Sequence, residues 1–130
     1  MKTTIERFED LIAWRKTRAL VNAIYRASGT GPWARDFSLR NQIRDAAISV
    51  PSNIAEGFER YRPREFHQFL SISKASCAEV RSDLYLARDL DYIDDTAFQA
   101  LLGQAFEAGR VIGGLRSSVE RQLPDKTSKP

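Results

Sequence analysis

The sequence predicts an all-α protein, an antiparallel up-and-down bundle of four helices. Apolar residues recur at spacings of three and four along four segments, and no segment of useful length has the alternating period of a strand. Glycine or proline residues punctuate the links, which are short. Four helices of about 25 residues, each about 37 Å long, therefore pack with successive helices in opposite directions.

The length and composition are those of one globular domain. A chain of 130 residues can bury a real core, and we place the domain at residues 1–122, followed by a disordered basic tail at residues 123–130. Cys77 and His67 are the only residues of their types, so no disulfide and no cysteine–histidine metal set can form within one chain. Without a signal peptide or an apolar run of about 20 residues, a cytoplasmic protein without a cofactor or a membrane partner is expected.

The first helix is expected from Ile5 to Ala27. Its apolar residues cover more than one stripe, which suggests two neighbours, one of them from another subunit. Gly29 is a candidate left-handed cap, and the glycine–proline pair Gly31-Pro32 prevents the helix from continuing.

The second helix carries the most unusual pattern. It starts near Asp36 or Ser38, either of which can cap it, and its apolar stripe continues to Phe58. Pro51 lies in the middle, where it cannot donate a hydrogen bond to the carbonyl of Ala47 and its ring crowds that turn. The helix is therefore expected to kink at Pro51 or to break there into two pieces.

The third and fourth helices complete the bundle. Pro63 suits the first turn of the third helix, which ends near Leu90. The fourth begins after Asp94-Asp95, and its inner stripe is expected to include Phe106. Glycine inside a helix costs about 1 kcal/mol relative to alanine, so the glycine-lined face is expected to touch a neighbouring helix or subunit closely. These glycines are Gly103, Gly109, Gly113 and Gly114.

A cluster of small polar residues surrounds Pro51. Carbonyls freed near a proline need donors, which serine and asparagine supply. One interpretation is a buried network that fixes the helix register, with Arg44 or an arginine of the third helix satisfying the carboxylate; the alternative is a ligand site. A lone carboxylate without a second acid or an activated nucleophile is a poor catalytic set. The cluster consists of Ser49, Ser52, Asn53 and Glu56.

An arginine rim, defined as Arg60, Arg62 and Arg64, is expected at one end of the bundle, with Arg40 and Arg44 extending it along the second helix. Arginines outnumber lysines about three to one, which favours phosphate or carboxylate partners. A basic rim suits the phosphate backbone of RNA or DNA, and Tyr61 can stack on a base. The net charge of +3 argues against strong affinity. In the alternative, the loop arginines pair with neighbouring acids, namely Glu56, Glu59 and Glu65.

A ribonuclease is the third alternative. Four residues separate Arg62 from His67, and six separate Arg60 from His67, the spacing of the catalytic pair in helical HEPN ribonucleases. Tyr61 or Pro63 follows the arginine where that class prefers a polar residue. The arginines also lie in a connection rather than on a helix, so a surface histidine is the simpler interpretation.

Four parts of the chain, from about Phe8 to Phe106, resemble the bacterial "four-helix bundle protein" family, the large-subunit ribosomal RNA intervening-sequence proteins. They are residues 8–16, which contain Phe-Glu-Asp-Leu and then Trp and Lys, residues 42–57, the third-helix residues Glu65-Phe66, Phe69-Leu70 and Glu79, and residues 90–93. Ala75 and Asp91 depart from the pattern, since many relatives have glycine there. The resemblance implies an all-α bundle and a ring-shaped homopentamer. It extends to the accessory proteins of diversity-generating retroelements, which bind nucleic acid and a reverse transcriptase. It implies no catalysis.

The first functional hypothesis is a non-enzymatic homo-oligomeric scaffold, a pentamer by the resemblance, that binds RNA or DNA weakly through the arginine rim. The second is a protein-interaction ring that docks a protein encoded nearby. It is motivated by the modest charge and by Trp33 and Tyr61, which are expected to be exposed. The third is the ribonuclease that uses Arg62 and His67.

Overall fold

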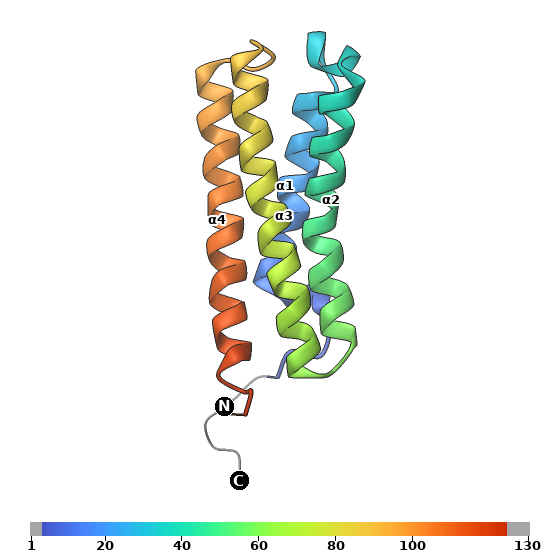
Figure 1. The fold of residues 1–130 in the computed structure, drawn as a ribbon, viewed down its shortest axis with the longest axis vertical. Coiled ribbons are helices and arrows are strands. Elements are labelled where there is room, and N and C mark those ends of the chain that lie inside the picture. The colour runs from blue at the N-terminus through green and yellow to red at the C-terminus, as the bar shows by residue number, and fades with distance from the viewer. Residues whose placement is uncertain (1–3, 125–130) are drawn as a thin grey trace.

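The computed structural model describes residues 4–124, which form four α-helices and two short 3-10 helices and contain no strand. The predicted all-α four-helix fold is therefore confirmed. Figure 1 shows the four long helices side by side, with α1 and α3 rising and α2 and α4 descending. Each helix packs against two others, and α4 closes the bundle against α1. The elements are η1 (Phe8–Asp10), α1 (Ile12–Ser28), η2 (Gly31–Arg35), α2 (Phe37–Glu59), α3 (Pro63–Asp89) and α4 (Asp95–Glu120).

The first helix begins at Ile12, so the predicted start at Ile5 is wrong. Leu11 has extended dihedral angles (φ −72°, ψ 129°) and separates η1 from α1. Phe8 packs edge-on against Trp14, with ring centroids 5.1 Å apart. The apolar pattern therefore continues through η1, but a turn rather than a helix brings it to the core.

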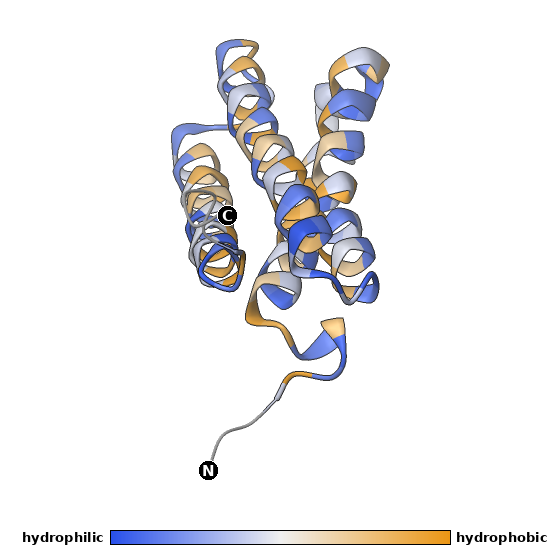
Figure 2. Ribbon diagram, turned by 60° about the horizontal axis from the view of Figure 1, so that its bottom comes forward, coloured by the Kyte–Doolittle hydropathy of each residue, from blue (hydrophilic) through white to orange (hydrophobic). Residues whose placement is uncertain are grey.

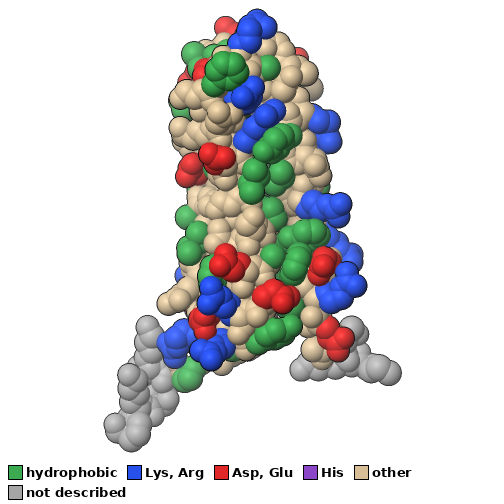
Figure 3. Space-filling model, turned by 90° about the vertical axis from the view of Figure 1, so that its right-hand side faces the viewer, with side chains coloured by type: hydrophobic (Ala, Val, Ile, Leu, Met, Phe, Trp, Pro, Cys, Tyr) green, Lys and Arg blue, Asp and Glu red, His purple; other side chains and the backbone are tan. Residues whose placement is uncertain are grey.

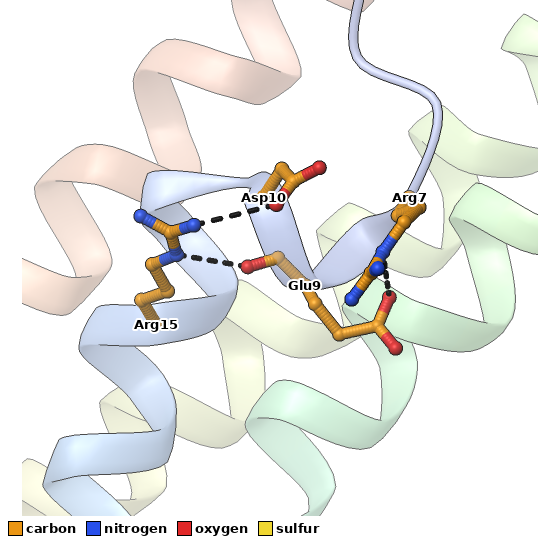
Figure 4. Close-up of polar contacts among 4 residues, drawn as sticks. All are labelled: Arg7, Glu9, Asp10 and Arg15. Atoms are coloured by element: carbon orange, nitrogen blue, oxygen red, sulfur yellow. Dashed lines mark hydrogen bonds and ion pairs between the residues drawn. The ribbon is translucent and has the colours of Figure 1, made fainter.

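Polar contacts hold this turn in place (Figure 4). Arg15 of α1 donates from Nε to the Glu9 carbonyl at 2.8 Å, and its Nη2 lies 3.3 Å from Asp10 Oδ1. Arg7 forms an ion pair with the Glu9 carboxylate at 3.7 Å. The bond from Arg15 satisfies the Glu9 carbonyl, which in a longer α1 would have accepted an amide within the helix.

The link after α1 also differs from the prediction. Gly29 has φ −93°, so it is not the predicted left-handed cap; the left-handed glycine is Gly31, with φ 61°. A Cβ at Gly29 would lie 3.0 Å from the Tyr25 carbonyl oxygen and 3.3 Å from Arg44 Nη2. Glycine at this position leaves room for the guanidinium of Arg44.

The second helix starts where the sequence predicted. Asp36 is its N-cap, and Asp36 Oδ1 accepts a hydrogen bond from the Leu39 amide at 3.1 Å. The helix is continuous through Pro51 from Phe37 to Glu59, which excludes a break into two pieces. A kink at Pro51 stays a prediction.

Helices α2 and α3 approach most closely at Gly57. A Cβ added there would lie 2.5 Å from Phe69 Cβ and 3.0 Å from Phe66 Cδ1. Pro63 occupies the first turn of α3, as predicted. Asp94 caps α4 by accepting from the Ala97 amide at 2.8 Å, and the helix begins at Asp95, within one residue of the predicted start.

The core is formed by one face of each helix. Figure 2 shows hydrophobic and hydrophilic stretches alternating along the helices, as expected for helices with one buried face. Phe106 is an exception to the predicted stripe, because its side chain is 61% exposed. It follows the buried Ala105 and is therefore rotated by about 100° away from the core.

The short helix η2 lies at the upper end of the bundle in Figure 1, and its Trp33 is fully buried. The predicted exposure of Trp33 is wrong. The indole stacks on Tyr92 of the α3–α4 link, with centroids 6.1 Å apart and an interplanar angle of 19°. The 3-10 turn of η2 folds this side chain back against the helices.

Within residues 4–124, no helix combines the length and hydropathy needed to cross a membrane. The predicted tail reaches beyond the described residues, since positions 125–130 lie outside them.

Candidate nucleic-acid interface

The arginine rim spans the link between α2 and α3 and the first turn of α3, which contains Arg64, and two of its members are paired with acids. Arg60 is 3.5 Å from Glu56 and 3.5 Å from Glu65, and its guanidinium lies 5.3 Å from the centroid of the Phe69 ring. Arg62 lies 3.4 Å from the same Glu65 carboxylate. Much of the positive charge at this end is therefore balanced locally.

The other residues of this link are more available. Among residues 4–124, no carboxylate lies within ion-pair distance of Arg64, which is exposed. Tyr61 has φ 56° and is 74% exposed, with its ring centroid 6.2 Å from that of Phe58. The left-handed backbone at Tyr61 ends α2 and turns the phenol outward. Arg64 of the rim and Tyr61 of the link are thus best placed to meet a ligand.

Arg44 does not extend the rim. It is separated from Arg60 by about 24 Å along α2, at about 1.5 Å per residue. Its Nε donates to Ser28 Oγ at 2.8 Å, its Nη2 donates to the Tyr25 carbonyl at 3.2 Å, and its guanidinium lies 4.2 Å from the centroid of the Tyr25 ring. These contacts tie α2 to α1.

Arg40 also makes its contacts at the end of the bundle where η2 lies. Its Nη1 donates to the Ala34 carbonyl of η2 at 2.9 Å, and its guanidinium lies 4.7 Å from the centroid of the Phe37 ring. The structure therefore separates Arg40 and Arg44 from the rim with which the sequence grouped them.

The polar cluster around Pro51 forms a partial network. Asn53 Nδ2 donates to the Ser49 carbonyl at 2.8 Å and to Ser49 Oγ at 2.9 Å. Ser49 Oγ also lies 2.9 Å from Ser76 Oγ of α3. The α3 side of this network was missed, because serine spacing on α3 does not indicate which helix it faces.

Two members of the predicted cluster do not join this network. Ser52 is exposed, and the Glu56 side chain is 57% exposed and pairs with Arg60 rather than with Arg44. A buried donor comes instead from α3: Ser73 Oγ donates to the Val50 carbonyl at 2.8 Å. The network thus joins α2 to α3 next to the proline.

His67 has an acidic partner on α4. Its Nε2 lies 2.9 Å from Glu120 Oε1, whereas Arg62, the other half of the ribonuclease hypothesis, contacts Glu65. Ser71 Oγ donates to the His67 carbonyl at 3.0 Å and accepts a 2.7 Å hydrogen bond from Arg116 Nε. No group of three or more potential metal-binding side chains lies together in the part of the chain described here.

A second basic surface lies between α3 and α4 and was not predicted. It is a hollow of about 460 Å³, called here the α3–α4 groove, and its ten lining residues include four cations and no acid. The sequence signal was present as cations and glycines at helical spacing, but the pattern does not show that two helices bring them together. The groove is defined by Lys74, Arg81, Gly109, Arg110, Gly113 and Arg116.

Cys77 lies under this groove. Its side chain is 1% exposed, and Sγ donates to the Ala105 carbonyl at 3.1 Å, so the predicted buried free thiol is confirmed. Burial raises the pKa of the Cys77 thiol, and the nearby Arg81 and Lys74 offset part of that rise.

Comparison with known proteins identifies the family. Residues 9–114 match the family of 23S rRNA-intervening sequence proteins. The chain belongs to this family. The resemblance noted in residues 8–16, 42–57 and 90–93 is therefore confirmed. No match is found among curated proteins.

A solved structure has the same fold as this intervening-sequence family member. It is the crystal structure of a protein of unknown function from the S23 ribosomal protein family of Bacteroides thetaiotaomicron. The TM-score is 0.76, the identity is 17%, and the match covers 82% of this chain and 96% of that one. At this identity the likeness shows the fold alone.

Proposed function

We propose that this intervening-sequence family member is a non-enzymatic helical scaffold that self-associates and binds the phosphates of RNA or DNA weakly. The observation that carries the self-association is the number of large apolar side chains on the outer helix faces. Ile12, Leu90 and Ile72 are 64%, 53% and 50% exposed, respectively. Contiguous exposed apolar patches are typical of contacts with another protein, and the proposal is that such side chains meet in one patch on an outer face. Figure 3 shows hydrophobic side chains at several heights on one side of the bundle, interspersed with charged ones.

Weak phosphate binding is supported by the composition of the rim. Arg64 has no carboxylate partner among the described residues, and Tyr61 of the preceding link is 74% exposed. Arg60 and Arg62 would have to exchange Glu56 and Glu65 for phosphate. That exchange makes the free energy of phosphate binding less favourable, because fewer counterions are released for each phosphate bound.

The non-enzymatic assignment is supported by the partners of the two residues that the ribonuclease hypothesis needs. His67 is paired with Glu120, and Arg62 with Glu65. If the purified protein cleaves RNA and His67→Ala abolishes that cleavage, the non-enzymatic assignment is wrong.

Self-association is tested by light scattering coupled to size exclusion at micromolar concentration. The expected mass is a multiple of the 14.8 kDa chain, and a pentamer has five times that mass. A single species at the mass of one chain would overturn the self-association. Ile12→Ser and Ile72→Ser, tested separately, ask which outer face forms the contact, because each removes one exposed apolar side chain without touching the core.

Phosphate binding through the rim is tested with labelled RNA at low and high salt. The triple variant Arg60→Ala, Arg62→Ala and Arg64→Ala is expected to bind more weakly and with a smaller salt dependence. Unchanged binding would remove the rim from the proposal. If the unaltered protein binds no nucleic acid at low salt and co-purifies with a second protein, the protein-interaction ring replaces this proposal; the exposed Tyr61 is the observation that favours it.

A further inference from the structure

We infer that the α3–α4 groove binds single-stranded nucleic acid, with phosphates on its cations and bases on two adjoining aromatic rings. This inference rests on the proposed nucleic-acid binding and gives it a second site, away from the rim. Cations from two helices converge on this groove. Lys74 and Arg81 enter the groove from α3, and Arg110 and Arg116 enter it from α4, with no acid in the lining.

The cations of the groove are less neutralised by carboxylates than those of the rim. Within the described range of the chain, Lys74, Arg81 and Arg116 have no carboxylate within ion-pair distance. Arg116 donates to a neutral partner, Ser71 Oγ, at 2.7 Å. Arg110 alone is held by an acid, with its Nε and Nη2 2.7 and 2.8 Å from the Glu107 carboxylate oxygens. Three charges thus remain available for phosphate.

Two glycines of α4, Gly109 and Gly113, lie along the groove. A Cβ at Gly113 would lie 3.3 Å from Lys74 Cε, closer than ordinary van der Waals contact, and one at Gly109 would lie 3.7 Å from Cys77 Sγ. A larger side chain at either position would occupy the space between the cations. Gly109 and Gly113 therefore leave this part of the groove free of side chains from α4.

Two aromatic side chains, Phe106 and Tyr85, lie beside the cations. Phe106 lines the groove and is 61% exposed, and the guanidinium of Arg81 lies 5.8 Å from the centroid of its ring. Tyr85 is 52% exposed and shares an adjoining hollow of about 360 Å³ with Phe106 and Arg81. The continuous surface from Arg116 to Leu102 extends about 21 Å along α4.

The combination of cations and rings selects the ligand. Cations alone would bind any polyanion, but exposed rings add a stacking contribution only for bases that are not paired in a duplex. Phosphate binding without base-edge donors or acceptors carries no sequence code, so we expect little sequence preference. The groove therefore fits a single strand of RNA or DNA.

The experiment measures fluorescence anisotropy of short labelled oligouridine at several salt concentrations. The groove variant combines Lys74→Gln, Arg81→Gln and Arg116→Gln, and we expect at least tenfold weaker binding. The slope of log affinity against log salt should fall in magnitude by about 0.7 for each phosphate that the variant no longer neutralises. The matched control removes three exposed arginines outside the groove, at Arg26, Arg35 and Arg121, and should change affinity much less. Circular dichroism verifies that both variants are folded.

The aromatic part has its own pair of variants. Phe106→Ala should weaken binding about fivefold, from a stacking contribution of about 1 kcal/mol. Phe37→Ala, which removes a ring that is 62% exposed at the start of α2, should not. Oligodeoxyuridine should bind comparably to oligouridine, whereas equal affinity for a duplex of the same length would contradict stacking.

The outcomes separate this inference from the proposed function. Loss of binding in the groove variant, with the control unaffected, supports the groove. Loss of binding in the rim variant alone would contradict nucleic-acid binding in the groove and would leave the proposed function intact. Equal loss of binding in the groove and control variants would also contradict binding in the groove, because only total charge would then matter. Absence of binding by the unaltered protein at low salt overturns both.

Discussion

Tyr92 Oη donates a 2.7 Å hydrogen bond to Asp36 Oδ2, while Asp36 Oδ1 accepts the amide of Leu39 and caps α2. One carboxylate thus joins the start of α2 to the link between α3 and α4. The hydrogen bond from Tyr92, followed by that from the Leu39 amide, lowers the pKa of Asp36, and the same carboxylate raises the pKa of Tyr92. Trp33 of η2 stacks on Tyr92, so the pair Tyr92–Asp36 lies next to the indole that packs at this end of the bundle.

The first prediction concerns the acid side of this pair. Because the folded-state pKa of Asp36 is lowered, its stabilisation is present above the unfolded-state pKa and is lost as pH falls through the folded-state pKa. Tyr92→Phe removes the main cause of the lowering. It should reduce the melting temperature by a few degrees at neutral pH and by much less in acid, as measured by circular dichroism over a pH series. Tyr85→Phe is the control, and an equal loss at every pH for Tyr92→Phe would contradict the linkage.

The second prediction concerns the close approach of α2 and α3. Gly57→Ala places a Cβ 2.5 Å from Phe69 Cβ, so the helices must move apart. We expect a loss of about 1–3 kcal/mol in the free energy of unfolding, the usual range for overpacking. Gly103→Ala is the matched control in α4, because nothing lies within 4 Å of its added Cβ. It should instead add up to about 1 kcal/mol. Chemical denaturation measures both, and equal signs would be inconsistent with the packing described.

The third prediction concerns a buried acid outside the candidate sites. Asp83 of α3 is 2% exposed; Gln42 Nε2 donates to its Oδ1 at 3.1 Å, and its Oδ2 has no hydrogen-bond partner. Burial, and then the charge of Glu79, raise the pKa of Asp83, and the bond from Gln42 offsets part of this. The stabilising contribution of the protonated carboxyl is fully present below the unfolded-state pKa and is lost as pH rises through the folded-state pKa.

Replacing Asp83 with asparagine removes that charge at neutral pH. Asp83→Asn should therefore raise the free energy of unfolding by about 1 kcal/mol at pH 7, and the gain should shrink in acid. The exposed Asp45→Asn is the control. A gain for Asp83→Asn that is the same at neutral and acid pH would not come from ionisation of this carboxyl.

The fourth prediction separates structure from ligand binding at Arg44. Arg44→Ala removes two hydrogen bonds to α1 and leaves Ser28, which is fully buried, without that donor. It should cost about 1–2 kcal/mol of folding free energy and leave RNA affinity unchanged. Denaturation and anisotropy are measured on the same sample. Weaker RNA binding with unchanged stability would return Arg44 to the phosphate site that the sequence suggested.

The sequence predicts those features of the bundle that depend on local periodicity and capping. Asp36, Pro63 and Asp94 lie at helix starts as expected, because capping and the first-turn preference for proline act within a few residues. The start of α1 was misplaced because a 3-10 turn can present the same apolar residues as a helix. Trp33 was misjudged because its burial depends on Tyr92, which is remote in sequence.

The candidate site was harder to predict for a related reason. A long arginine side chain can reach several partners, and the fold decides which one it meets. Arg40 and Arg44 meet carbonyls and rings at one end, and Arg60 meets two glutamates at the other. The groove needs α3 and α4 side by side, in the register that brings Lys74 next to Gly113. Helical periodicity gives the faces but not that register.

The position of Cys77 offers an internal reporter of motion. It is the sole thiol of the chain and lies buried between α3 and Ala105 of α4. Because Cys77 is 1% exposed beneath the α3–α4 groove, the rate at which a thiol reagent labels it under native conditions measures how often the structure around it opens. The natural protein therefore carries its own probe of local unfolding, without an introduced label, and a ligand that bridges α3 and α4 should slow the labelling.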